Sequence, residues 1–170
     1  MIADIVLQAF RFVIILLLQI LVLNNITLPG VFNAYIYIYF IMTLPLSISH
    51  SALILVSFLC GLSVDVFSNS LGIHAFTCTF IGFLRPYIIT LLKPSGGYNP
   101  EDKPRLYSLG FRWFVMYSII VVFIMHFMLF LIETLSINQI LLVLTKTLSS
   151  SLLAVIIIIL IEYFFYKRKS

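Results

Sequence analysis

One acidic side chain, Asp65, lies well inside an apolar stretch of this chain and is the first candidate for chemistry. An ionisable group is costly in the interior of a membrane, so it usually faces other helices or a wet cavity and has a partner. Lys146, His126 and His74 lie in or at the start of three other apolar stretches. We expect these four side chains to converge in one half of a helical bundle, with Asp65 and Lys146 in direct contact. The group forms either a site for a ligand or partner helix, or a polar contact that fixes helix packing.

A serine protease is one enzyme class to weigh for these residues. The stretch Gly61-Leu62-Ser63-Val64 resembles the loose GxSx pattern of rhomboid-type intramembrane proteases, with His126 as a conceivable base. So short a match is weak alone, because a catalytic dyad is defined by geometry. Ser63 also lies about 200° around a helix from Asp65, away from the small residues on that face. We therefore expect no catalytic residues, with a rhomboid-like protease as the minor alternative.

The other reactive side chains form no pattern typical of catalysis or metal binding. Glu133 and Glu162 lie near the ends of apolar stretches, so neither is placed to form a carboxylate pair with Asp65. Cys60 and Cys78 lie in apolar runs without CxxC or Cys/His spacing, and no phosphate-binding glycine loop is present. We expect no metal ion, no cofactor and no small-molecule substrate.

The composition indicates that lipid surrounds most of the chain. Of 170 residues, 62% are hydrophobic and 9% are charged, whereas a soluble domain has roughly 25% charged residues. The net charge of +4 does not indicate nucleic acid, because the basic residues cluster in one loop and at the C-terminus. This clustering is typical of a membrane protein whose loops set its orientation.

The apolar stretches predict an all-α, polytopic membrane protein with about six transmembrane helices in a single membrane domain over residues 1–170. The two stretches after the first are short for a full crossing and predict a tight helical hairpin. The helices are expected at 5–23, 34–46, 52–67, 71–92, 111–135 and 139–166, with a hydrophilic linker over 93–110.

The basic residues predict the orientation. They flank the linker at Lys93, Lys103, Arg105 and Arg112, and three more end the chain, so both regions and both termini are expected in the cytoplasm. These side chains either bind cytoplasmic partners or acidic lipid, or act in topology alone. Tyrosines near the ends of two stretches are expected to anchor the chain at the membrane interfaces, namely Tyr35, Tyr37, Tyr39, Tyr163 and Tyr166.

Small residues recur at helical spacing on two neighbouring stretches. They fall on one face of each stretch and predict close helix packing within the chain, part of which is left for a partner helix. These residues are Ser57, Gly61 and Asp65 on the first stretch, and Gly72, Ala75, Thr79 and Gly82 on the second.

The segment from Gly61 to Ala75, GLSVDVFSNSLGIHA, resembles the signature of the rod shape-determining protein MreD family. The early turn at residues 25–29, the Arg85-Pro86-Tyr87 motif and the basic linker agree with that family. The resemblance implies a non-enzymatic, multi-pass subunit of the bacterial cell-elongation complex in the cytoplasmic membrane. Its implied partners are MreC, the filament protein MreB, and the peptidoglycan glycosyltransferase RodA with its transpeptidase.

A transporter subunit is the alternative from a different class. The family resembles the substrate-binding S components of vitamin-type transporters in helix number and arrangement, and Asp65, His126 and Lys146 would then line a ligand pocket. The first stretch lacks the AxxxA element with which such components dock, because Val13 follows Ala9 at that spacing. We therefore expect the scaffold function first and the transporter function second.

Overall fold

The computed structural model describes residues 2–25, 34–99 and 102–164, and all regular structure in these ranges is helical, as the sequence predicts. The predicted basic tail, Tyr166 and most of the turn at residues 25–29 lie outside the described residues. The α-helices are α1 (Ile2–Leu21), α2 (Ile38–Met42), α3 (His50–Ser68), α4 (Ile73–Leu91), α5 (Leu106–Leu109), α6 (Phe111–Thr134) and α7 (Ile140–Phe164), with 3-10 turns at Leu23–Asn25 and Ile137–Gln139.

Four helical segments are long and apolar enough to cross a membrane, which supports the predicted membrane protein. They are Leu7–Asn25, His50–Ser68, Phe111–Thr134 and Ile140–Phe164. Helix α4 has 19 residues, as α3 does, but it is not among the four. Its hydropathy is lowered by His74, Arg85 and Pro86, which lie within it. The five long helices lie within three residues of their predicted ends.

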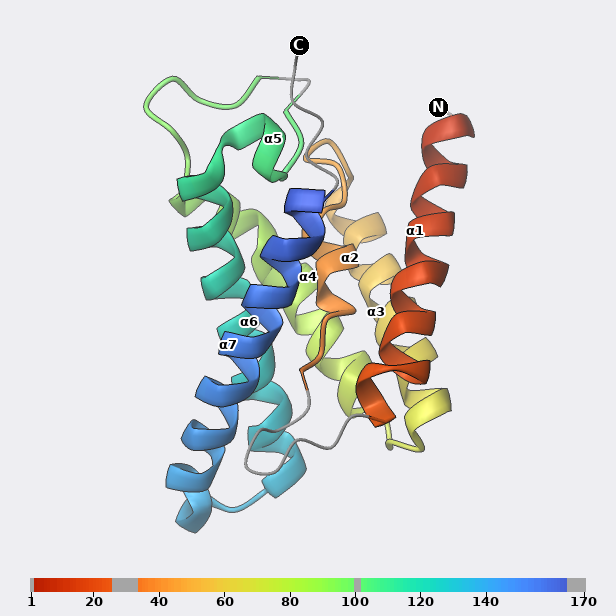
Figure 1. Cartoon of the computed structure of the whole chain (residues 1–170), viewed down its shortest axis with the longest axis vertical. Helices are drawn as coiled ribbons and strands as arrows, with labels where there is room; N and C mark the ends of the chain where they lie inside the picture. The colour runs from red at the N-terminus through yellow and green to blue at the C-terminus, as the bar shows by residue number, and fades with distance from the viewer. Residues whose placement is uncertain (1, 26–33, 100–101, 165–170) are drawn as a thin grey trace.

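The helices form two antiparallel pairs with a short segment between them (Figure 1). Helix α3 packs along α4, and α6 packs along α7, while contacts between α4 and α6 join the pairs. Helix α1 lies outside α3, and α2 lies in the middle of the bundle. The start of α1 and the end of α7 lie at the same end of the molecule, together with α5 and the linker (Figure 1).

The segment Ala34–Leu44, here called the central segment, is buried along its whole length. The sequence predicts a helix over residues 34–46, but only Ile38–Met42 is helical there. Pro45 disfavours helical backbone at the residue before it, which limits the helix at its end. The predicted interfacial role of Tyr35, Tyr37 and Tyr39 is also wrong, because their exposed fractions are 9%, 1% and 4%.

Polar side chains bind the backbone at the start of the central segment. Gln19 Nε2 donates to Ala34 O at 3.3 Å, and the Ile36 amide donates to Gln19 Oε1 at 2.8 Å. The Tyr35 amide donates to His126 Nε2 at 3.2 Å. Away from water, each unpaired backbone group costs several kcal/mol, so non-helical backbone needs such partners. Gln19 and His126 thus make this short path through the bundle possible.

Arg85 binds the other end of the central segment. Its Nη2 donates to Met42 O at 3.3 Å and also to Leu44 O, and its Nε donates to Tyr117 Oη at 3.1 Å. The Tyr117 hydroxyl in turn donates to Met42 O at 3.2 Å. Hydrogen bonds from a charged donor are stronger than neutral ones. Arg85 and Tyr117 therefore hold the carbonyls that α2 leaves unpaired where it ends.

Close packing of α3 on α4 depends on two glycines. A Cβ added at Gly61 would lie 2.6 Å from the Ala75 Cα, and one at Gly82 would lie 2.8 Å from the Ser57 Cβ. Gly72 differs from its predicted role, because a Cβ there would meet nothing within 4 Å. Its φ of +85° belongs to the left-handed region, so Gly72 shapes the turn rather than the helix contact.

Glu162 joins three elements at the end of the bundle that carries the linker. Its carboxylate accepts hydrogen bonds from the Tyr39 hydroxyl at 2.5 Å, from Arg105 Nη1 at 3.1 Å and from the Leu106 amide at 3.3 Å. The side chains of Arg105 and Glu162 are 6% and 1% exposed. Arg105 is therefore part of a buried ion pair, and the expectation that it faces cytoplasmic partners is wrong. Lys93, Lys103 and Arg112 are exposed.

Candidate functional site

Asp65 holds the turn between α3 and α4. Its Oδ1 accepts hydrogen bonds from Ser70 Oγ at 2.6 Å and from the His74 amide at 3.1 Å, and its Oδ2 accepts one from the Ala75 amide at 2.7 Å. The side chain is 4% exposed. Asn69, with a φ of 51°, ends α3 in the left-handed region and turns the chain back toward Asp65.

This geometry places a carboxylate at the positive end of a helix. The first amides of a helix have no partner within it, and a negative charge there is stabilised by the helix dipole. Asp65 comes from the preceding helix but acts as the cap of α4, whose flanking residue Gly72 has no side chain for that purpose. Local donors thus stabilise the buried carboxylate.

The predicted contact between Asp65 and Lys146 is not formed. The Lys146 ammonium lies 5.7 Å from the centroid of the Phe130 ring. Such a position is typical of a cation–π interaction. Within the part of the chain that the structure describes, the ion pair is Arg105 with Glu162. The physical reason is that the α3–α4 turn itself supplies the donors that Asp65 needs.

His74 and His126 lie close together, with Tyr35 between them. The Tyr35 ring centroid is 5.0 Å from that of His74 and 5.8 Å from that of His126. His74 Nδ1 lies 2.7 Å from the Tyr37 hydroxyl, and the His126 ring lies 6.0 Å from Phe130. The two histidines therefore belong to an aromatic cluster that packs around the start of the central segment.

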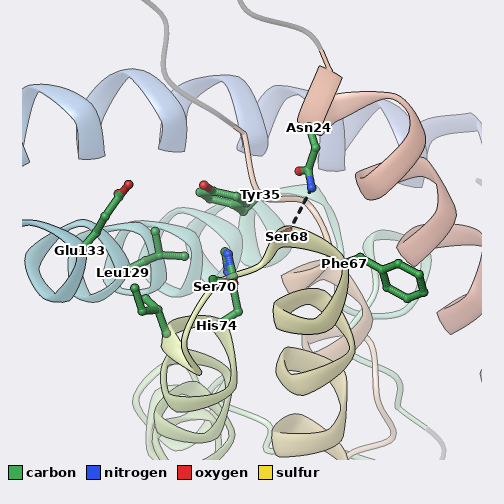
Figure 2. Close-up of a pocket in the computed structure, with 9 residues that line it drawn as sticks. Asn24, Tyr35, Phe67, Ser68, Ser70, His74, Leu129 and Glu133 are labelled. Atoms are coloured by element: carbon green, nitrogen blue, oxygen red, sulfur yellow. Dashed lines mark hydrogen bonds between the residues drawn. The ribbon is translucent and has the colours of Figure 1, made fainter.

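A cavity of about 360 Å³ lies beside the α3–α4 turn, and we call it the turn cavity. Figure 2 shows Tyr35, His74 and Glu133 around it, from the central segment, α4 and α6. Asn24 Nδ2 donates to Ser68 Oγ at 3.3 Å across one side of the opening. The lining residues are Asn24, Tyr35, Phe67, Ser68, Ser70, Ile73, His74, Leu129 and Glu133.

The turn cavity is large enough to hold a small polar molecule or a side chain of a partner protein. Its volume lies near the lower end of the range for ligand pockets, about 300–1,000 Å³. Its polar groups include a carboxylate, an amide, hydroxyls and an imidazole. Among the described residues, no group of three or more histidine, cysteine, aspartate or glutamate side chains is placed to bind a metal ion.

Ser63 and His126 are not brought together as a catalytic dyad. The Ser63 hydroxyl donates to the Leu59 carbonyl within its own helix at 2.8 Å. Both ring nitrogens of His126 have partners, since Nδ1 lies 2.9 Å from the Val122 carbonyl and Nε2 accepts the Tyr35 amide. The geometry that a serine–histidine pair requires is therefore not formed in this structure.

The roles of Gln19 and Arg85 are not predicted from the sequence. Both are polar residues within apolar stretches, which is a signal that they face the bundle interior. The presence of polar residues in apolar stretches does not reveal that their partners are backbone groups of a non-helical segment. Their mutual arrangement follows only from the three-dimensional structure, in which α1 and α4 flank opposite ends of that segment.

The fold and the turn cavity define a helical membrane protein with a buried central segment and a rigid turn. Comparisons of the chain with protein-family models, curated proteins and solved structures find no match.

Proposed function

We propose that this chain is a non-enzymatic scaffold subunit of the bacterial cell-elongation complex, of the MreD type, in the cytoplasmic membrane. Its partners would be MreC, and through it MreB and RodA with its transpeptidase. The observation that carries the proposal is the turn between α3 and α4. The residues on which the resemblance depends contact one another there, which favours a structural role over a catalytic one.

The signature residues build a rigid platform. Gly61 brings α3 against the backbone of α4, Asp65 binds the first amides of α4, and Gly72 supplies the left-handed backbone between them. The turn displays Leu71, whose side chain is 99% exposed. An exposed apolar side chain on a fixed turn is suited to bind a partner protein, because little conformational entropy is lost when it docks.

The proposed topology has six passes, with the central segment as the second. Helix α1 starts and helix α7 ends at the same end of the bundle (Figure 1). This arrangement supports a cytoplasmic position for both termini. The exposed Lys93, Lys103 and Arg112 lie beside the helix ends at that same end, as the positive-inside rule requires. Leu71 would then face the periplasm.

Co-isolation of MreC tests the scaffold function. The tagged chain, purified in mild detergent from a rod-shaped host, is expected to retain MreC. Leu71→Asn should reduce the recovered MreC several-fold while the melting temperature stays unchanged, because the side chain contacts no neighbour. Leu135→Asn is the matched control, since Leu135 is 85% exposed at the α6–α7 turn. Equal MreC recovery with both variants would contradict the proposed role of Leu71, and no MreC with the unaltered chain would contradict the scaffold.

A substrate-binding transporter subunit is the second candidate, and the turn cavity favours it. The cavity presents polar groups from the Leu23–Asn25 turn, the central segment, α3, α4 and α6 to a space of about 360 Å³. Native mass spectrometry of the purified chain distinguishes the two functions. A bound vitamin-sized molecule that is lost with Glu133→Leu, without MreC, would favour the transporter.

A further inference from the structure

A second cavity, of about 490 Å³, lies at the opposite end of the bundle from the turn cavity. It is formed by the start of α3, the end of α4 and the linker, and we call it the linker cavity. Its lining includes the polar side chains of Ser47, His50, Arg85, Thr90 and Asn99. Nothing in the proposed scaffold function uses it.

Arg85 is buried in the wall of the linker cavity, and no carboxylate of the described residues pairs with it. Its exposed fraction is 2%, and the ion pair among the described residues joins Arg105 to Glu162 instead. A guanidinium is permanently cationic, and a buried charge is costly unless an opposite charge compensates it. The carbonyls of Met42 and Leu44 offer only partial negative charge. The site therefore has an excess positive charge.

One nitrogen of Arg85 remains available to a ligand. Hydrogen bonds to protein atoms use Nε and Nη2. Nη1 takes part in none of these hydrogen bonds. It is also not one of the fully buried side-chain atoms of the described residues that lack a hydrogen-bond partner, whereas Arg105 Nη2 is one of them. Since Arg85 lines the cavity, Nη1 is the nitrogen with which it can donate to a ligand there.

We propose that the linker cavity binds a phosphate group, with Arg85 Nη1 as its charged donor, and that the phosphate belongs to the headgroup of an anionic phospholipid. Arginine binds phosphate oxygens with directed hydrogen bonds. Ser47, His50 and Thr90 add polar groups at the rim, while Leu53 and Ile89 give the same cavity an apolar wall. This combination fits a molecule with a polar head and an apolar body.

The charge at this end of the bundle supports a lipid as the source of the phosphate. Lys93, Lys103 and Arg112 are exposed around the linker, and basic residues near a membrane surface attract anionic lipid. The long apolar helices bring the linker cavity to the level at which headgroups lie. A headgroup can therefore reach Arg85 without leaving the bilayer.

Lipid binding to the whole purified chain in detergent tests the proposal. Phosphatidylglycerol is expected to raise the melting temperature and to give bound-lipid peaks in native mass spectra, whereas phosphatidylcholine gives neither. Equal effects of the two lipids would overturn the proposal. Stabilisation by inorganic phosphate, without retained phosphatidylglycerol, would overturn the lipid as the source.

Two matched variants test the position of the site without altering Arg85, whose loss would unfold the central segment. Ser47→Glu places a carboxylate at the rim, where it repels phosphate and competes for Nη1, so phosphatidylglycerol affinity should fall about tenfold. Ser95→Glu introduces the same charge at an exposed linker position that does not line the cavity, and its affinity should stay within about twofold. Equal loss in both variants would show a general surface-charge effect and overturn the assigned site.

Discussion

The carboxylate of Asp65 accepts a hydrogen bond from the backbone amide of Ala75 at 2.7 Å, which joins the end of α3 to the start of α4. The residues are ten apart in sequence, and Gly61 packs against the same Ala75. The signature segment is thus held by one buried charge and one close backbone contact.

Asp65→Asn removes the charge and is expected to destabilise the fold. An amide replaces one of the two carboxylate oxygens by a donor, so it must lose an acceptor for Ala75 or for His74 and Ser70. The loss of a helix cap with charged hydrogen bonds costs about 1–3 kcal/mol. Thermal unfolding in detergent, followed by circular dichroism, measures it. An unchanged melting temperature would contradict the capping role.

Lys146→Met tests the absence of a direct Asp65–Lys146 contact. Because Asp65 binds the α4 amides and Lys146 lies over Phe130, the effects of Asp65→Asn and Lys146→Met should add in the double variant, within about 0.5 kcal/mol. The unfolding free energies of the unaltered chain, the two single variants and the double variant form a double-mutant cycle. A coupling energy well above that value would support a direct contact between Asp65 and Lys146 after all.

Gly61→Ala should separate α3 from α4 locally. The new methyl group would lie 2.6 Å from the Ala75 Cα, a backbone atom that cannot rotate away. Such overpacking costs about 1–3 kcal/mol. The control is Gly96→Ala in the linker, where a Cβ meets nothing within 4 Å. Comparing their melting temperatures checks the prediction, and equal values would contradict it.

Arg85→Lys should destabilise the chain although it keeps the charge. An ammonium cannot reproduce the contacts that Nε makes to Tyr117 while Nη2 binds the carbonyls of Met42 and Leu44. Tyr117→Phe removes only the hydroxyl and should cost about 1 kcal/mol. Amide hydrogen exchange of the central segment, with α7 as the reference, measures the loss of protection in these variants. Equal exchange in Arg85→Lys and the unaltered chain would contradict this role of Arg85.

Glu162→Gln should be more damaging than loss of the whole ion pair. The single change leaves Arg105 buried without a carboxylate, which costs about 3–5 kcal/mol. Adding Arg105→Met to Glu162→Gln removes the unpaired charge while the side-chain oxygen of the new glutamine stays as an acceptor for Tyr39 or Leu106, so the double variant is expected to be milder. Melting temperatures of the single and double variants test this order, and the reverse order would contradict it.

Hydrophobic patterning was enough to predict the five long helices, although by length and hydropathy α4 is not among the four candidate membrane spans of the described residues. Hydrophobic patterning failed at residues 34–46, because an apolar run predicts a helix whether or not its backbone is helical. The signature also pointed to Asp65 as a central residue. Its partner could not be predicted, since the left-handed Asn69 and Gly72 decide which amides come within reach.

The central segment has a consequence for how the protein is made. Of the side chains that bind its backbone, Gln19 is synthesised before it, whereas Arg85, Tyr117 and His126 emerge later. The full set of hydrogen bonds to residues 34–44 can therefore form only after residue 126 has been synthesised. A chain truncated before α6 would lack Tyr117 and His126, and the backbone groups that they bind would be left without these partners.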